Sequence, residues 1–104
     1  MEILKKNTVE PLVVDMRDRL TTITNMSTVT NLRFDVIGKD PVTEADVVKI
    51  SNGVPTTNGM KVICVIDTST GGGWASAEYR VYIKFTDGST SPILFAGKFR
   101  VEDD

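Results

Sequence analysis

Polar and apolar residues alternate with a period of two along several short segments of the chain. In segment 77–86, one face carries Tyr79, Val81, Ile83 and Phe85, and the other carries Arg80, Tyr82, Lys84 and Thr86. A helix would spread these side chains around its circumference, whereas a strand separates them onto two faces. The pattern therefore predicts a strand that is buried on one side.

Shorter alternations predict further strands over 10–17, 30–37, 46–50, 60–66 and 93–101, and a short one near 20–25. Segment 62–66 is apolar on both faces, which indicates a central strand covered on both sides. Segment 42–48 is compatible with one helical turn capped by Thr43. However, Val47, Val48 and Ile50 are β-branched and favour an edge strand instead.

Turn signals separate these segments. They are dipeptides that suit a positive φ and prolines that interrupt strand pairing, namely Asn52-Gly53, Asn58-Gly59, Asp87-Gly88, Pro41, Pro55 and Pro92. We therefore expect an all-β fold, a single antiparallel β-sandwich of about seven strands with little or no helix. Residues 9–104 would form the sandwich. Residues 1–8 would form an N-terminal arm that either packs on a neighbouring molecule through Ile3 and Leu4 or is frayed.

The residue types in the chain limit which catalytic and metal-binding sites it can form. The chain has 104 residues, the size of one domain, and contains no histidine. Serine–histidine and cysteine–histidine nucleophile systems therefore cannot form within one chain, and the commonest imidazole metal ligand is missing. Asp15, Asp35, Asp67 and Asp87 could supply a glycosidase pair, but no spacing selects two of them. We expect no enzyme activity, no catalytic residues, no metal and no cofactor.

Charge and hydropathy limit the kinds of partner that we expect for the chain. A net charge of −2 without a basic cluster argues against nucleic acid. No apolar run approaches the ~20 residues of a membrane helix, and the N-terminal residues lack the pattern of a secretory signal, so we expect no membrane partner and synthesis in the cytoplasm. The single cysteine, Cys64, excludes an internal disulfide, and its apolar surroundings predict a buried core residue.

Segment 67–74, DTSTGGGW, is the most site-like part of the sequence. A phosphate-binding loop needs a lysine and a hydroxyl residue after its last glycine and then a helix, whereas Trp74 and a predicted strand follow here. The offsets from Asp67 to Ser69, Gly72 and Glu78 resemble a calcium-binding loop. Only two carboxylates are present, however, and neither flank is helical, so the simpler interpretation is a loop between two strands.

Two aromatic residues are candidates for contact with partners. Trp74 could stack on a sugar ring or anchor an interface, or its ring could fold over one end of the sandwich and cover the core. Tyr82 lies on the polar face of its predicted strand and suits surface recognition. Together with Ile3 and Leu4, these two residues are the candidate interface residues of the chain.

Three segments carry a family resemblance, LRFDV at 32–36, CVIDTSTGGGW at 64–74 and AEYRVYIKFTDGSTSPILFAGKFRV at 77–101. Their order resembles the small immunoglobulin-like β-sandwiches in the virions of tailed bacteriophages, including the N-terminal domains of some upper baseplate proteins. In that family a Gly-x-Tyr-x-Val type strand follows a loop and precedes a final Phe-x-Val strand. Tyr79 with Val81 and Phe99 with Val101 match these strands, but Ala77 or Glu78 stands where the family often has glycine.

The resemblance implies an immunoglobulin-like sandwich and a non-enzymatic structural component of a tailed-phage virion. That component would be a head decoration protein or a head-to-tail or tail accessory protein. It would be made in the cytoplasm of the bacterial host and act through assembly contacts with major capsid, neck or tail proteins. It would be a homo-oligomer or stand in many copies on a symmetric particle. The alternative is a carbohydrate-binding β-sandwich module, with or without calcium, that uses segment 71–74 and Tyr82.

Overall fold

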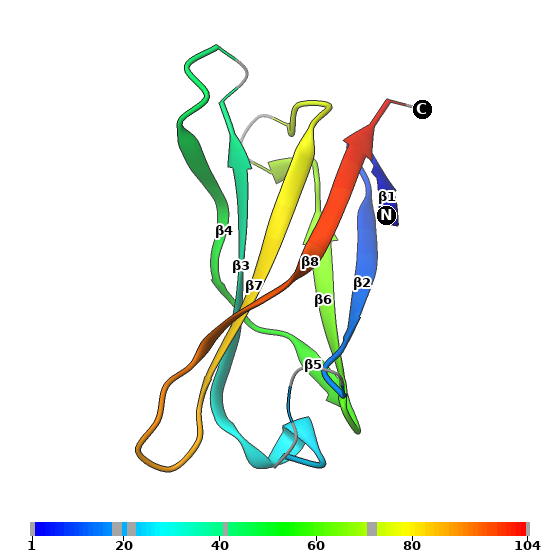
Figure 1. Ribbon diagram of the computed structural model, residues 1–104. Helices are drawn as coiled ribbons and strands as arrows, with labels where there is room; N and C mark the ends of the chain where they lie inside the picture. Colours follow the sequence, from blue (N-terminus) through cyan, green and yellow to red (C-terminus); the bar gives the residue numbers. More distant parts are fainter. Residues whose placement is uncertain (1, 18–19, 21–22, 41, 71–72, 104) are drawn as a thin grey trace.

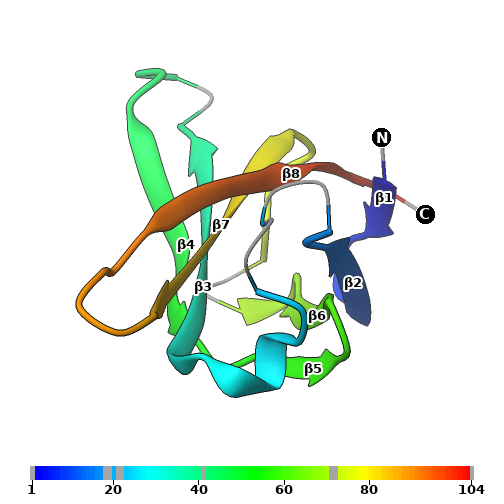
Figure 2. The same ribbon diagram turned by 60° about the horizontal axis from the view of Figure 1, so that its bottom comes forward.

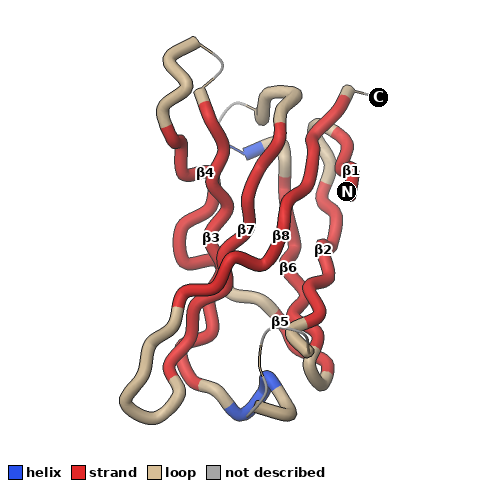
Figure 3. The backbone as a smooth tube through the Cα atoms, in the orientation of Figure 1, coloured by secondary structure: helices blue, strands red, loops and turns tan. Residues whose placement is uncertain are grey.

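The computed structural model describes residues 2–17, 20, 23–40, 42–70 and 73–103, and their regular structure is almost entirely β (Figures 1 and 3). The strands are β1 (Glu2–Lys5), β2 (Val9–Asp15), β3 (Thr30–Lys39), β4 (Asp46–Gly53), β5 (Thr56–Asn58), β6 (Lys61–Asp67), β7 (Glu78–Thr86) and β8 (Ile93–Glu102). A 3-10 turn, η1 (Met26–Thr28), closes the lower end of the sandwich in the view of Figure 1. Among these residues no helix is long and apolar enough to cross a membrane.

The strands form two facing sheets, so the expected all-β, two-layer arrangement is confirmed (Figure 2). One sheet has five strands in the order β1-β8-β7-β3-β4, and the other has three in the order β2-β6-β5. The expectation of a purely antiparallel sandwich is wrong, because β1 pairs with β8 in parallel. The chain then turns through Asn7, whose φ is 56°, and crosses to the second sheet as β2.

The main predicted strands are confirmed to within a few residues, and the segment from Asp46 is an edge strand as expected. The predicted strand near 20–25 is absent from the described residues of that range, 20 and 23–25, while 21–22 lie outside the description. Two strands that were not predicted, β1 and β5, bring the described strands to eight instead of about seven, and β1 lies within segment 1–8, expected to be an arm. Both are short, at four and three residues, and too brief for a clear alternation.

The core lies between the sheets and is filled by the inward-facing side chains of the alternating strands. At one end Trp74, Tyr79 and Phe99 pack together, with ring centroids 5.1 to 6.2 Å apart. The Tyr79 hydroxyl donates a 2.8 Å hydrogen bond to the Ala75 carbonyl. Gly38 makes room for this ring, since a Cβ there would lie 2.4 Å from Tyr79 Cε1. The position therefore requires glycine for close packing.

A tight two-residue turn sets the register of β5 against β6. Asn58 and Lys61 flank such a turn, and Gly59 has a φ of 60°, as the first central position of a type II′ hairpin requires. The turn signal at Asn52-Gly53 works differently, because Asn52 takes the positive φ of 56° rather than the glycine. Asn52 is stabilised there because its N–H donates a 2.8 Å hydrogen bond to Asp35.

Strand β6 is central in its sheet, as segment 62–66 predicts, but it is covered on one side only. Val62, Cys64 and Ile66 face inward and are fully buried, whereas Val65 faces outward and is 55% exposed. The expectation of cover on both faces is therefore wrong. The reason is topological, because the described strands form only two layers and the outer side of this sheet leaves Val65 exposed.

Candidate interaction surface

The outer face of the three-stranded sheet carries a cluster of aliphatic side chains, which we call the aliphatic face. It consists of Val9, Pro11 and Val13 on β2 and Ile63 and Val65 on β6. The three valines are 53 to 63% exposed, and Ile63 is half-buried. Single exposed aliphatic residues are ordinary, but a contiguous apolar group on one sheet face is typical of a contact surface.

Strand register brings these side chains together. Pro11 stands opposite Val65 and Val13 opposite Ile63, so the four residues form two neighbouring rows across the sheet. Outward-facing residues of a strand recur at every second position, which is why residues separated in sequence share this face. Strand β6 has a charged residue at each end, beyond the two rows: Lys61 is its first residue and Asp67 its last.

The strand edges are less suited to binding than this face. In β2 the edge contains Pro11, which has no N–H to donate to an added strand. The edge strand β4 is distorted by register shifts against β3 between Phe34 and Ile37. Edge strand β1 has only four residues. Short strands, prolines and bulges are the devices that block pairing at exposed edges, so we take the face as the candidate contact surface.

The outer face of the five-stranded sheet is different, because cross-strand ion pairs cover much of it. Lys84 on β7 and Asp35 on β3 are 3.0 Å apart, and both are largely covered by their neighbours. Arg80 and Lys39 both pair with Asp46 at 2.9 and 3.4 Å. The pairs of Lys84 and Lys39 join neighbouring strands, whereas the pair of Arg80 with Asp46 reaches from β7 across β3 to β4. Together they make this part of the outer face polar.

One aromatic group interrupts this polar face, in addition to the exposed side chains of Ile3 on β1 and Val48 on β4. Tyr82 on β7 packs edge-on against Phe95 on β8, with ring centroids 5.7 Å apart at 62°. Phe95 is 47% exposed and Ile93, nearby on β8, is 67% exposed. Strand β8 has a β-bulge between Phe95 and Gly97, the residues that pair with Tyr82 and Val81, and the bulge bends the strand at this point. The aromatic group has fewer side chains than the aliphatic face and is bordered by Lys84, which stands opposite Ile93.

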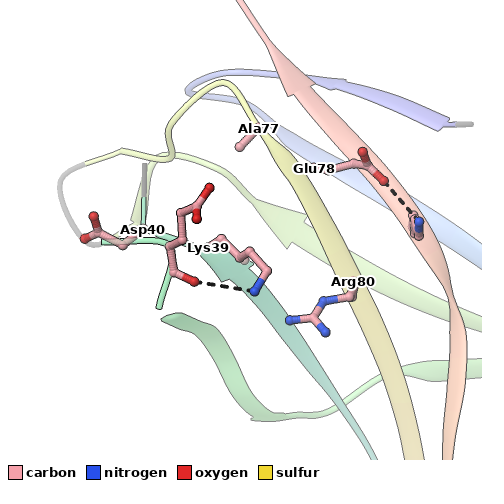
Figure 4. A pocket seen from close by; sticks show the side chains of 8 residues that line it. Lys39, Asp40, Ala77, Glu78 and Arg80 are labelled. Atoms are coloured by element: carbon pink, nitrogen blue, oxygen red, sulfur yellow. Dashed lines mark hydrogen bonds and ion pairs between the residues drawn. The ribbon is translucent and has the colours of Figure 1, made fainter. Parts of the chain in front are cut away.

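A hollow of about 410 Å³ opens where the β3–β4 turn approaches the start of β7 (Figure 4). Figure 4 shows Lys39 and Arg80 pointing into the same space, while Glu78 turns toward Lys98, its partner at 3.4 Å. The pKa of Asp40 is lowered by hydrogen bonds from the N–H groups of Thr43 and Val42, which fix this residue in its turn. The hollow is thus lined by groups already engaged in ion pairs and turns.

The segment considered for calcium does not bring ligands together among the described residues. Asp67 accepts hydrogen bonds from the hydroxyl and then the backbone N–H of Ser69, and these bonds lower the pKa of its carboxyl. Glu78 pairs with Lys98 instead. The described residues contain no group of three or more acidic, cysteine or histidine side chains that could hold a metal ion, and Gly71 and Gly72 lie outside the description.

Cys64 is buried in the core, and the acidic residues of the other turns have local partners. Cys64 is fully buried, and burial raises its thiol pKa to about 12, so it stays protonated. Asp15 forms a bidentate pair with Arg17, which lowers the pKa of the carboxyl. Asp87 exchanges backbone hydrogen bonds with Thr90 across its turn.

The four candidate interface residues from the sequence occupy two kinds of position. Leu4 and Trp74 lie in the core of their own chain, with 2 and 3% of their surface exposed. The indole N–H of Trp74 donates a hydrogen bond to Thr70 at 3.1 Å. Ile3 is 52% exposed and Tyr82 is half-buried, so these two remain at the surface, both on the five-stranded sheet.

Sequence reasoning did not single out the aliphatic face. Its signal was present, because Val9, Pro11 and Val13 alternate with inward-facing residues and segment 62–66 is apolar on both sides. Among the described residues no α-helix covers the second side of that strand, so one side stays exposed.

Comparison with protein-family models, with curated proteins and with solved structures gave no match.

Proposed function

We propose that the protein is a non-enzymatic structural component that acts by docking through its aliphatic face, and that it belongs to the virion of a tailed bacteriophage. The observation that carries the docking function is the exposure of Val9, Val13 and Val65 on one sheet face. Fully burying a valine side chain is worth about 1.5–3 kcal/mol, so three half-exposed valines offer a useful fraction of a binding energy. Many copies on a symmetric particle would multiply that contribution.

The virion assignment is supported by the resemblance over 32–101. The segments that carry it supply β3, β6, β7 and β8, which are the long central strands and the last strand. Within this proposal the protein is a head decoration or a head-to-tail or tail accessory protein, made in the host cytoplasm. Its partners are other virion proteins.

An immunoglobulin-like arrangement is part of the same proposal, and the strand order supports it. Immunoglobulin domains place strands B, E and D in one sheet and C, F and G in the other, with C′ added beside C in variable-type domains. Taking β2 as strand B makes β6 strand E and β5 strand D, in the order observed. The remaining strands, β3, β4, β7 and β8, then correspond to C, C′, F and G. The departure is β1, which lies beside β8 rather than in the sheet of β2.

Tyr79 supports this arrangement independently. A tyrosine near the start of strand F whose hydroxyl bonds to backbone a few residues upstream is a hallmark of immunoglobulin domains. Tyr79 is the second residue of β7, and its hydroxyl donates to the carbonyl of Ala75. Val81 stands where antibody domains carry the second cysteine of their disulfide.

A carbohydrate-binding function gains no support from the geometry. The ring that would stack on a sugar is Trp74, which is 3% exposed and packs against Tyr79 and Phe99. Tyr82 presents one edge to Phe95 and is half-buried. Stacking on a sugar needs an open aromatic face.

Copurification with assembled particles tests the proposed function. The wild-type protein should sediment with phage particles, and Val65→Lys should reduce its incorporation because a lysine would be buried at the contact. Val48→Lys is the matched control, since Val48 is a strand valine with 57% exposure on the other sheet. A wild-type protein that stays free after assembly would contradict the virion assignment. Equal incorporation of both variants would contradict the role of the aliphatic face.

A further inference from the structure

We propose that the aliphatic face binds a second copy of this chain, face to face, about a two-fold axis that runs across the strands. This inference rests on the proposed docking function and names the partner of that face. It starts from the outward-facing side chains of β6, which follow the order Lys61, Ile63, Val65 and Asp67. A cation stands at one end, an anion at the other, and two aliphatic residues lie between them.

This order makes the face complementary to itself in one orientation. A two-fold axis that brings two identical faces together must lie in the interface, and it can run along the strands or across them. An axis along the strands places Lys61 opposite Lys61 and Asp67 opposite Asp67. An axis across the strands turns β6 end for end and places Lys61 of each copy opposite Asp67 of the other. Charge complementarity therefore selects the second orientation.

The apolar rows fit the same rotation. Turning the face end for end places the Pro11–Val65 row of one copy over the Val13–Ile63 row of the other. Aligned sheets pack with their strands about 30° apart and about 10 Å between layers, which suits side chains of this size. Asp15, at the end of β2, already pairs with Arg17 at 2.6 Å and needs no partner from the second copy.

The outer face of the five-stranded sheet shows why the second copy docks on the aliphatic face. The ion pairs of Lys84 with Asp35 and of Arg80 with Asp46 are satisfied within the chain. Covering them with another copy would remove water from charged groups without forming new pairs. On the aliphatic face the same contact removes water mainly from hydrocarbon, with Lys61 and Asp67 at its ends.

Sedimentation equilibrium across roughly a hundredfold range of concentration tests the dimer. Wild type should reach twice the chain mass of 11.4 kDa. Val65→Lys should raise the dissociation constant at least about tenfold, and Val48→Lys should leave it unchanged. Circular dichroism should show that both variants are folded. A wild-type protein that stays at 11.4 kDa throughout, or an equal effect of the two variants, would overturn the proposal.

Salt dependence and cross-linking test the orientation. Added salt should weaken the wild-type dimer by screening Lys61 from Asp67, whereas it should strengthen the Lys61→Glu dimer by screening like charges. Layers about 10 Å apart are too far for a disulfide, so the cysteines are joined with a short bismaleimide cross-linker. A mixture of Lys61→Cys and Asp67→Cys proteins should give cross-linked pairs in higher yield than either variant alone. Cys64 does not compete, because it is fully buried. A higher yield from Lys61→Cys alone would overturn the axis across the strands.

These results separate the dimer from the proposed function. A monomeric wild-type protein whose Val65→Lys variant still fails to join particles would reject the second copy as partner and keep the aliphatic face as a docking surface. A dimer that is absent from particles would reject the virion assignment and keep this inference.

Discussion

The outer faces of the two sheets arise from the same alternation of side chains and differ in how their charges are arranged. On the five-stranded sheet, Asp35 lies in the middle of β3 and pairs with Lys84, and Asp46 at the start of β4 pairs with Lys39 and Arg80. On the three-stranded sheet, Asp15, Lys61 and Asp67 stand at the ends of the strands and leave aliphatic rows between them. A face whose charged side chains pair across its strands is suited to water, whereas a face with charges only at its strand ends is suited to a partner.

The largest difference that mutation should reveal lies between the inner and outer sides of one short strand. Leu4→Ala removes a side chain that is 2% exposed and should lower the free energy of unfolding by about 2–5 kcal/mol. Ile3→Ala, at a 52% exposed neighbour, should change it by less than about 0.5 kcal/mol. Urea unfolding of both variants measures the contrast. Equal losses would mean that β1 is not paired with β8 as described.

A smaller loss is expected from the hydrogen bond at the start of β7. Tyr79→Phe keeps the packed ring and removes the hydroxyl that donates to Ala75, which should cost about 0.5–1.5 kcal/mol. Tyr82→Phe, on the outer face of the same strand, removes a hydroxyl that accepts a longer hydrogen bond of 3.3 Å from Arg80 and should cost less. If Tyr79→Phe is as stable as wild type in urea, the Tyr79 hydroxyl contributes nothing to the fold.

The ion pairs of the five-stranded sheet should contribute less again. Lys84→Met breaks its pair with Asp35 and should lower the free energy of unfolding by at most about 1 kcal/mol, because neither partner is fully buried. Repeating the measurement in high salt should shrink the difference from wild type. A difference that persists in high salt would show that Lys84 acts by packing rather than by charge.

Acid should reveal the smallest effect, through the paired carboxyl of Asp46. The hydrogen bond and charge of Lys39, followed by the charge of Arg80, lower the pKa of Asp46 below its usual value. A carboxyl with a lowered folded-state pKa stabilises the protein above its unfolded pKa, and that contribution is lost as the pH falls through the folded value. Stability should therefore fall below about pH 4, and less steeply in Asp46→Asn. Identical slopes for the two proteins would rule out this contribution.

The sequence predicts the fold well where a side-chain pattern is long enough to read. Strand β7 follows from the alternation of Tyr79, Val81, Ile83 and Phe85, and all four are buried. Strands β1 and β5 are too short to alternate clearly, and the parallel pairing of β1 depends on β8, nearly a whole chain length away. Local periodicity carries no information about such pairings.

The candidate surface was less predictable than the fold. An isolated tryptophan such as Trp74 suggests recognition, yet its ring fills the space beside Tyr79 and Phe99. The aliphatic face depends on register, because Val13 and Ile63 become neighbours only when β2 and β6 pair. A sequence shows which residues are apolar in a strand, but the number of layers decides which of them stay exposed.

Hydroxyl-radical footprinting of the protein in its assembled and dissociated states tests the difference between the faces most directly. The account predicts that labelling of Val9, Val13 and Val65 falls on assembly, while labelling of Val48, Ile93 and Phe95 stays the same. Protection of Phe95 and Ile93 with continued labelling of Val65 would contradict it, and would place the contact on the five-stranded sheet.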